Sequence, residues 1–321
     1  MAPHSEMSPP VSVVISVYNG EKYLARCLDS AVGQTYGNIE IVVVNDGSTD
    51  STGVILKEYS DRYPAIKVIG QSNMGLEMAR KTGVANASGK YVQYLDADDT
   101  FCSEDTVACL VKLAEEHQAD MVISPFVLCY EDGREISYMA GEGLVQGGDY
   151  IRDMLSGKGY YAIWAKFHKR SLYDDSIERI GVGVGEDAVL SVQLLSRSGN
   201  VYLSRTPVID YYIYASSMSH DVTDRTYNDF MKYTAWLERY VTENIDCDLS
   251  RELVFYRTRN IMTRVYWRKK DEGREMPAVL ENVKRYPEIM EVLPRREQKI
   301  IRAFRLSRLA GRIQLAYYGR K

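Results

Sequence analysis

The sequence predicts an α/β fold built on a mostly parallel sheet, and two observations carry this prediction. Short runs rich in β-branched residues alternate with stretches in which apolar residues recur at helical spacing. The strand-like runs are also apolar along most of their length, as is typical of strands that helices cover on both faces. The alternation continues from Val11 to Tyr130. Such a pattern predicts strand, helix, strand units.

The sequence of residues 11–130 predicts strands and helices that alternate along the chain. Residues 11–17 are rich in β-branched side chains and are followed by Asn19-Gly20, which is typical of a strand followed by a turn. Ser103, followed by Glu104 and Asp105, is typical of a helix N-cap with acidic residues in the first turn. We expect strands at residues 11–17, 39–44, 66–70, 91–95 and 120–130, and helices at 21–34, 52–63, 75–86 and 103–117.

The remainder divides into an irregular middle and a helical end. Residues 135–219 contain glycine-rich loops at 141–148 and 181–185, and tyrosine-rich strands are expected near 160–167 and 208–214. From Asp224 onward the pattern is helical. Breaks are expected near Cys247, Pro277, Pro287 and Pro294.

Composition limits the class of protein. The 321 residues are 45% hydrophobic and 26% charged, as in soluble globular proteins. The five cysteines follow no CxxC or Cys/His spacing, so we expect a reduced, cytoplasmic setting without structural zinc. Residues 1–10 resemble no secretory signal and are expected to be disordered. The longest apolar run, Val11–Tyr18, is too short to span a bilayer.

Charge is distributed unevenly along the chain. Residues 1–250 contain 21 Lys and Arg against 36 Asp and Glu, a net charge of −15. Residues 251–321 contain 19 against 8, a net charge of +11. The acidic part disfavours nucleic acid as the main partner, whereas the basic end favours an anionic surface or an acidic partner.

Polar residues follow three of the predicted strands. Ligands bind beyond the carboxyl ends of the strands in an open parallel sheet. Tyr18 and Asn19 follow the first strand, Asp46 and Gly47 the second, and the run Asp96-Ala-Asp-Asp99 the fourth. Clustered carboxylates repel one another, so this run suits a hard cation such as Mg²⁺ or Mn²⁺. A plain turn and helix N-cap is the alternative interpretation.

No phosphate-binding glycine loop follows the first strand. Neither GxxxxGK[ST] nor GxGxxG is present there, which disfavours P-loop and NAD-dependent enzymes. The spaced glycines Gly181, Gly183 and Gly185 precede Glu186-Asp187 instead, and we interpret them as a flexible loop beside an acid pair.

Several motifs together resemble the nucleotide-sugar domain of family 2 glycosyltransferases with the GT-A fold. They are Val13-Val-Ile-Ser-Val-Tyr-Asn19, Ile41-Val-Val-Val-Asn-Asp-Gly-Ser-Thr-Asp50, Asn73-Met-Gly75 with Ala79-Arg80, and Tyr94-Leu-Asp-Ala-Asp-Asp99. Later motifs resemble the branch that assembles bacterial surface polysaccharides, such as capsule and exopolysaccharide: Trp164-Ala-Lys-Phe-His-Lys-Arg-Ser-Leu172, Glu186-Asp187 with Val189-Leu190, and Tyr211-Tyr-Ile-Tyr214 with Ser217-Met-Ser219. The resemblance covers residues 11–220.

This resemblance implies an inverting, metal-dependent enzyme that moves a sugar from a UDP-sugar to a glycan or lipid-linked oligosaccharide. Tyr18 would line the uracil, Asp46 would accept a hydrogen bond from the base imide, and Asp96 would approach the ribose or the water shell of the metal. The residues implied for the nucleotide sugar are Tyr18, Asn19, Asp46, Gly47, Asn73, Arg80, Asp96 and Ala97. Arg80 could equally be a surface charge.

The resemblance also implies the metal, the base and the acceptor contacts. Asp98 and His220 would bind Mn²⁺ or Mg²⁺, and Asp187 would be the base, supported by Glu186. Trp164 and Lys166 would contact the acceptor, although Ala165 stands where an Asn is common. Plain alternatives stay open: a helix N-terminus for the acid pair, a surface role for His220 and a core role for Trp164.

The resemblance suggests a catalytic domain, and the charge and helical pattern of the remaining residues suggest a separate basic region and a location. Residues 11–220 would form the GT-A catalytic domain, with a nucleotide-sugar half at 11–130 and an acceptor half at 131–220, and 221–321 a basic helical region. On one helical wheel, an arginine face lies opposite an apolar face. The arginines are Arg302, Arg305, Arg308 and Arg312, and the apolar residues Ile300, Phe304, Leu306, Ala310, Ile313 and Leu315. We hypothesise that this helix docks on the inner leaflet of the cell membrane; packing on the protein body is the alternative.

Two other functions compete with sugar transfer. A sugar nucleotidyltransferase is disfavoured because no glycine- and lysine-rich phosphate loop follows the first strand. An inactive scaffold that binds nucleotide or glycan for another transferase would need neither the Asp96–Asp99 run nor Asp187. The sequence leaves the sugar, the linkage, the acceptor and the oligomeric state open, a homodimer included.

Overall fold

The chain forms two compact units. The computed structural model describes residues 8–137, 141–214, 223–268 and 272–318. The first unit comprises Met1–Gly147 and Tyr161–Tyr233, and the second comprises Gly148–Tyr160 and Thr234–Lys321. The helix α7 (Asp224–Asn244) contains the passage from one unit to the other at Tyr233.

The first unit is built on a mixed sheet of eight strands in the order β3-β2-β1-β4-β10-β6-β11-β9. In that order the strands are Ile66–Gln71, Ile39–Asp46, Val11–Val17, Tyr91–Tyr94, Lys166–Lys169, Met121–Ile123, Asn200–Leu203 and Gly143–Gln146. The first four strands of this order pair in parallel, β10 is antiparallel to both of its neighbours, and β9 is antiparallel to β11. The predicted α/β class is confirmed.

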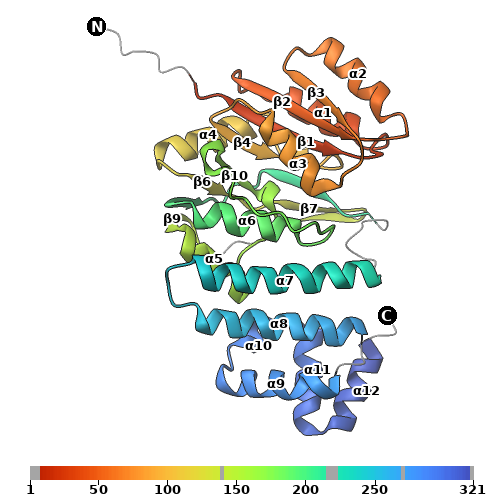
Figure 1. Ribbon diagram of the computed structural model, residues 1–321, viewed down its shortest axis with the longest axis vertical. Helices are drawn as coiled ribbons and strands as arrows, with labels where there is room; N and C mark the ends of the chain where they lie inside the picture. Colours follow the sequence, from red (N-terminus) through yellow and green to blue (C-terminus); the bar gives the residue numbers. More distant parts are fainter. Residues whose placement is uncertain (1–7, 138–140, 215–222, 269–271, 319–321) are drawn as a thin grey trace. The chain divides into compact units, whose positions relative to one another are not determined.

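The parallel strands are buried as their composition predicts. β1 pairs with β2 from Val11↔Ile39 to Val17↔Asn45, and the central residues of both strands are shielded from solvent. Helices pack along this sheet (Figure 1). They are α1 (Leu24–Val32), α2 (Thr52–Arg62), α3 (Leu76–Ala85), α4 (Thr106–Glu116) and α6 (Glu186–Ser196).

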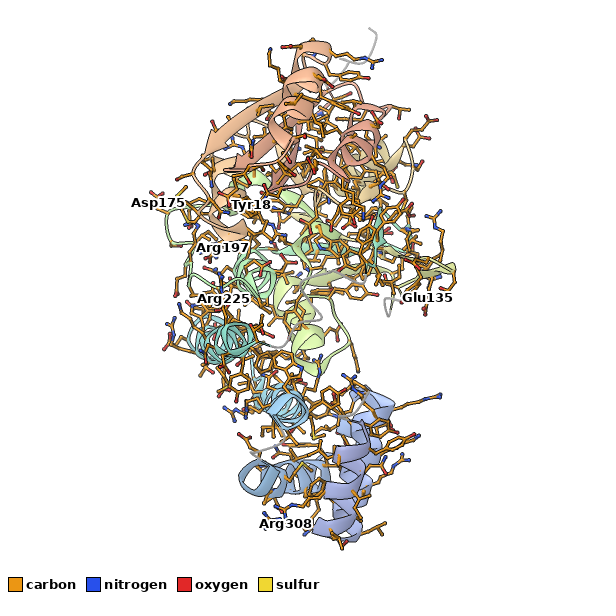
Figure 2. All side chains as sticks on the ribbon, turned by 90° about the vertical axis from the view of Figure 1, so that its right-hand side faces the viewer. Tyr18, Glu135, Asp175, Arg197, Arg225 and Arg308 are labelled. Atoms are coloured by element: carbon orange, nitrogen blue, oxygen red, sulfur yellow. The ribbon has the colours of Figure 1, made fainter. Side chains whose placement is uncertain are left out.

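A smaller sheet lies in the same unit, with the strand order β5-β12-β7-β8. These strands are Thr100–Phe101, Ile209–Tyr212, Val127–Tyr130 and Gly133–Ile136. β7 and β8 form a hairpin, and Glu135 on β8 points out into solvent (Figure 2).

Three predicted elements of this unit need correction. The expected strand at 120–130 is two strands, β6 and β7, in different sheets, because the chain turns at Pro125, which has no N–H for a sheet hydrogen bond. The expected strand at 160–167 begins only at Lys166, after a 3-10 turn at Ile163–Ala165. The helix expected from residue 103 begins at Thr106, with Asp105 at its N-cap position.

The second unit is helical, as expected. Its helices are α5 (Gly147–Ser156), α8 (Ser250–Arg268), α9 (Glu272–Arg285), α10 (Ile289–Val292), α11 (Arg295–Leu306) and α12 (Arg308–Tyr318), with the end of α7. Helices α8, α9 and α11 contribute Met262, Val265, Val279, Val283 and Ile300 to one buried core. No helix in the described ranges is long and apolar enough to cross a membrane.

Two predictions for this unit are wrong. Pro277 does not end a helix but lies within the first turns of α9, whose apolar face continues into the core at Val279 and Val283. The basic tail is not one helix, since Ser307 is extended (φ −164°, ψ 156°) and separates α11 from α12. Leu306 and Ile313, which a single helical wheel puts on one apolar face with the buried Ile300, are exposed.

Candidate active site

The loop after β1 is tied to the loop after β2. The N–H of Asn19 donates to Ser48 Oγ at 2.9 Å, and the side-chain oxygen of Asn19 accepts from the N–H of Thr49 at 2.8 Å. Tyr18, just before this tie, is 52% exposed at the surface of the first unit (Figure 2). The structure therefore presents the Tyr18 ring beside the ends of two parallel strands.

Asp46, at the end of β2, is 3% exposed and organises the approach to α3. Its Oδ1 accepts from Gln71 Nε2 at 2.7 Å and from the N–H of Met74 at 2.9 Å, and its Oδ2 accepts from the N–H of Gly75 at 2.8 Å. Each carboxylate oxygen can accept two hydrogen bonds, so Oδ2 can accept one more.

Gly47 and Asn73, both predicted to contact the nucleotide sugar, lie in close contact. Gly47 has φ +73°, and a Cβ there would lie 2.7 Å from the backbone nitrogen of Asn73. Only glycine combines this backbone conformation with so close an approach.

Arg80, on α3, is the centre of an ion-pair cluster. Its guanidinium hydrogen-bonds to Asp187, lies 3.5 Å from Glu186 Oε1 and lies 3.2 Å from Asp96 Oδ1. It also lies over the ring of Tyr94, 5.6 Å from the ring centroid. Burial alone would lower the pKa of Arg80, but the three carboxylates more than reverse this and raise it. The alternative of a surface charge is excluded by its burial.

The turn after β4 holds three carboxyl groups with perturbed pKa values. Burial raises the pKa of Asp96 to about 6, with Arg80 opposing the shift, and burial also raises the pKa of Asp98. Burial, together with the charges of Asp96 and Asp98, raises the pKa of Asp99 to about 9. Asp99 Oδ1 accepts from the N–H of Tyr212 at 2.9 Å. A positive charge placed in this turn would relieve the repulsion.

Arg26 on α1 holds the acidic turn from the other side. Its guanidinium donates to the backbone oxygen of Asp98 at 2.6 Å and to Tyr214 Oη at 2.8 Å, and lies 3.5 Å from the ring centroid of Tyr212. Arg26 is not among the site residues predicted from the sequence. One arginine on an amphipathic helix resembles an ordinary surface charge, and its partners come from distant positions in the chain.

The acid pair predicted to supply the base occupies the first turn of α6. Gly185 precedes it with φ +93°, and a Cβ there would lie 2.2 Å from the ring of Tyr233. Burial and the neighbouring charge of Asp187 raise the pKa of Glu186 to about 8. Asp187 is fixed by Arg80, so the two acids differ in environment although they are adjacent in sequence.

The two predicted acceptor residues are both buried. Trp164 stacks on Tyr211 with ring centroids 5.3 Å apart and meets Phe126 edge-on at 4.7 Å. Lys166 is fully buried and donates to the carbonyl of Ala162 at 2.7 Å. Burial lowers the pKa of Lys166 to about 7, and the charge of Asp187 opposes this. These contacts are typical of buried structural residues, and contact of Trp164 and Lys166 with the acceptor stays a prediction.

A buried hydrogen-bond chain runs behind Arg80. His168 Nδ1 lies 2.7 Å from the carbonyl of Lys166, so this nitrogen carries the proton. Nε2 therefore accepts from Tyr173 Oη at 3.0 Å, and Tyr94 Oη lies 2.8 Å from Tyr173 Oη. Burial lowers the pKa of His168 to about 4, which keeps the ring neutral at pH 7. This series of hydrogen bonds fixes the ring of Tyr94, over which Arg80 lies.

The donor set of the acidic turn suits a divalent cation. Its oxygens are carboxylates, the hard ligands that Mg²⁺ and Mn²⁺ prefer, and Asp99 Oδ2 is buried without a hydrogen bond from any described residue. Within the described ranges, no three His, Cys, Asp or Glu side chains converge into a complete metal-binding group. His220, the other predicted ligand, lies outside the described residues.

A cavity of about 270 Å³ adjoins this cluster on the side of α3 and α6. Arg80 and Glu186 line it, together with Tyr94, Tyr173 and Arg179. Its wall near residue 180 is anchored by Glu77, whose carboxylate accepts from the N–H groups of Ile180 and Gly181 at 3.1 and 2.9 Å. Glu77 is not among the site residues predicted from the sequence, because it resembles an ordinary acid in the first turn of a helix.

Comparison with known proteins identifies the family. The family described as "Glycosyl transferase family 2" matches residues 12–178, more than half of the chain. The chain belongs to glycosyltransferase family 2. The match includes the strand ends and the acidic turn, whereas Glu186-Asp187 follows it.

Individual relatives agree with this family. Glycosyltransferase GlyA of Streptococcus pneumoniae is 33% identical over 267 residues, covering 77% of this chain and 36% of GlyA, so the chain spans about a third of that relative. The uncharacterized glycosyltransferase YibD of Escherichia coli is 27% identical over 242 residues, covering 71% of this chain and 70% of YibD.

A solved structure confirms the GT-A fold. Staphylococcus aureus TarS 1–349 in complex with UDP-GlcNAc superposes with a TM-score of 0.69 at 17% identity, covering 96% of this family 2 chain and 91% of that one. At this identity, the likeness concerns the fold alone.

Proposed function

We propose that this family 2 chain transfers a sugar from a UDP-sugar to a hydroxyl group of a glycan or lipid-linked oligosaccharide, with inversion at the anomeric carbon. The cluster in which Arg80 contacts both Asp96 and Asp187 is the main support. In this cluster the acidic turn after β4 lies beside the first turn of α6. Residues proposed to bind the donor and the proposed base would therefore both contact the buried guanidinium of Arg80. TarS, of the same fold, has been solved with UDP-GlcNAc and with UDP, which supports a uridine donor.

The nucleotide end is supported by the residues after β1 and β2. The exposed ring of Tyr18 offers a face on which a uracil can stack. Asp46 Oδ2 can accept the N–H of the base imide in addition to that of Gly75. Asn19, Gly47 and Asn73 would shape this loop surface, and Asp96 with Ala97 would approach the ribose.

The chemical step needs one base. As the acceptor oxygen attacks the anomeric carbon, its proton passes to Asp187, and the bond from that carbon to the diphosphate oxygen breaks with its electron pair on UDP. Arg80 orients Asp187 through a hydrogen bond to its carboxylate. Burial raises the pKa of Glu186, which favours a protonated carboxyl group that can donate a hydrogen bond to a sugar hydroxyl.

We also propose that the reaction depends on Mg²⁺ or Mn²⁺. Asp98 would hold the ion in the acidic turn, and Asp96 would contact its water shell or the ribose. When bound, the ion supplies positive charge that stabilises the leaving diphosphate. Trp164 and Lys166 would support the acceptor side from beneath.

A panel of UDP-sugars, with Mg²⁺, Mn²⁺ or EDTA, tests this proposal by thermal shift and by release of UDP. We expect one UDP-sugar to raise the melting temperature and to be turned over only with metal. Asp98→Asn should abolish the metal-dependent part, whereas Asp61→Asn, on an exposed acid of α2, should change neither readout. Binding of a UDP-sugar without turnover in any metal would favour the inactive scaffold.

A further inference from the structure

The exposed surface of α11 and α12 is strongly basic. Within Arg295–Tyr318 there are seven cationic side chains, all exposed: Arg295, Arg296, Lys299, Arg302, Arg305, Arg308 and Arg312. The one acid in this range is Glu297, which is 5% exposed. Arg308, at the start of α12, projects from the surface in Figure 2. This surface therefore presents positive charge without an exposed carboxylate of its own.

Large apolar side chains are exposed among these cations. Leu306 is 84% exposed, Leu309 69% and Ile313 63%. Leu309 and Ile313 are four residues apart on α12, so they form a stripe along one side of the helix, continued by Tyr317. We call these four residues, with the seven cations, the basic apolar face.

The residues of the basic apolar face do not belong to the buried core of the second unit. Ile300, Phe304 and Leu315 point the other way and are buried in the helical core. Gly311 lies so close to Phe304 that a Cβ would be 2.2 Å from its ring, which fixes α12 against α11. The packed side and the exposed side are thus distinct, and Leu306, Leu309 and Ile313 present aliphatic surface to solvent on the exposed side.

We propose that the basic apolar face docks on the surface of an anionic lipid bilayer. The charge is complementary to headgroup phosphates, and the aliphatic side chains stand where they can enter the boundary between headgroups and acyl chains. Nucleic acid would pair with the cations but would leave three exposed aliphatic side chains in water, so lipid is the better fit. This proposal does not rest on the proposed function.

Vesicle flotation of the full chain tests the proposal. The vesicles are equal mixtures of phosphatidylglycerol and phosphatidylcholine, or phosphatidylcholine alone. We expect binding to the anionic vesicles that weakens with salt. Arg302→Ala/Arg305→Ala/Arg308→Ala should weaken it roughly 100-fold, since each cation near an anionic surface contributes about fivefold. Leu306→Ser/Leu309→Ser/Ile313→Ser should also abolish flotation.

Matched controls separate this face from general surface effects. Lys57→Ala/Lys112→Ala/Arg205→Ala removes three exposed cations of the first unit, and Val54→Ser/Ile136→Ser/Leu144→Ser removes three exposed apolar side chains there. Both should float as wild type does. Circular dichroism and UDP-sugar thermal shifts, measured on every variant, should match wild type, so a failure of the enzyme proposal would be visible separately.

Three results would overturn the proposal. The first is equal flotation with neutral and anionic vesicles. The second is flotation that neither face variant reduces. The third is absence of flotation; if light scattering then detects a dimer that Leu306→Ser/Leu309→Ser/Ile313→Ser dissociates, the face is assigned to contact between copies of the chain.

Discussion

Arg80 on α3 is hydrogen-bonded to Asp187 in the first turn of α6, and its second terminal nitrogen lies 3.2 Å from Asp96 in the turn after β4. The side chain of Arg80 is 5% exposed, so little water screens these contacts. A single guanidinium therefore fixes two carboxylates that belong to different parts of the proposed reaction.

Replacing Arg80 should damage both stability and activity. Arg80→Ala leaves partly buried carboxylates without their cation, so we expect the free energy of unfolding to fall by about 3 kcal/mol and kcat/KM to fall by roughly 10³. Arg80→Lys keeps the charge but cannot make both contacts. Its free energy of unfolding and its kcat/KM should therefore lie between those of wild type and those of Arg80→Ala. Urea titration and steady-state kinetics measure the two effects.

The control for Arg80 is Arg205→Ala, which removes an exposed arginine paired with Glu142. It should change the free energy of unfolding by less than about 1 kcal/mol. Wild-type kcat/KM in Arg80→Ala would show that the cluster does not serve the reaction.

Gly185 should tolerate no side chain. Gly185→Ala places a Cβ 2.2 Å from the ring of Tyr233 at a backbone φ of +93°, so we expect a loss of about 1–3 kcal/mol in unfolding free energy. Movement of the next two residues should also lower kcat. In Gly133→Ala the new methyl group meets no atom within 4 Å, and both quantities should stay near wild type. Equal effects of the two variants, in thermal melts and kinetics, would refute this role of Gly185.

The buried chain behind Arg80 should contribute to stability through Tyr173. Tyr173→Phe removes the donor to His168 Nε2 and the partner of Tyr94 Oη. We expect it to lower the free energy of unfolding by about 1–3 kcal/mol, because two buried polar atoms lose a partner. Tyr130→Phe, at a residue that is 42% exposed, is the control. Indistinguishable urea midpoints for the two variants would contradict the hydrogen-bond chain.

Glu297 should make the second unit less stable as pH rises. Burial raises the pKa of Glu297 to about 7, against an ordinary value near 4.5, with Arg296 and Arg259 opposing the shift. The protonated form is thus preferred in the folded state. Its stabilising effect is complete below pH 4.5, is lost as pH rises through about 7, and amounts to about 3 kcal/mol.

Urea unfolding of the full chain at pH 5 and pH 8, with helical circular dichroism as the readout, measures this effect. Glu297→Gln should remove this component of the difference between the two pH values, and the exposed Glu291→Gln should retain it. An unchanged difference in Glu297→Gln would mean that this carboxyl group does not cause it.

The parallel half of the fold could be predicted because its signal is local. The apolar β-branched runs of β1 and β2 have few alternatives to a buried strand, and the structure pairs them along their full length. The break at Pro125 was missed because the residues on both sides are strand-like, and their division between two sheets is decided by distant pairing partners. The break at Ser307 was missed for a similar reason, since docking of α12 on Phe304 selects two helices.

The site was predictable where a motif carries it and not where tertiary contacts do. The acidic turn and the pair Glu186-Asp187 are visible as sequence runs, but their meeting at Arg80 depends on the packing of α3 and α6. Arg26 illustrates what sequence could not show, because its partners Asp98, Tyr212 and Tyr214 converge only in the folded unit.

The most direct test of Asp187 as the base is to measure transfer and donor binding in Asp187→Asn. The asparagine keeps the size of the side chain but cannot take the acceptor proton. We predict that kcat falls by roughly 10³ or more, while the Kd for the UDP-sugar stays within about threefold of wild type. Transfer by Asp187→Asn at a rate near that of wild type would contradict the central claim.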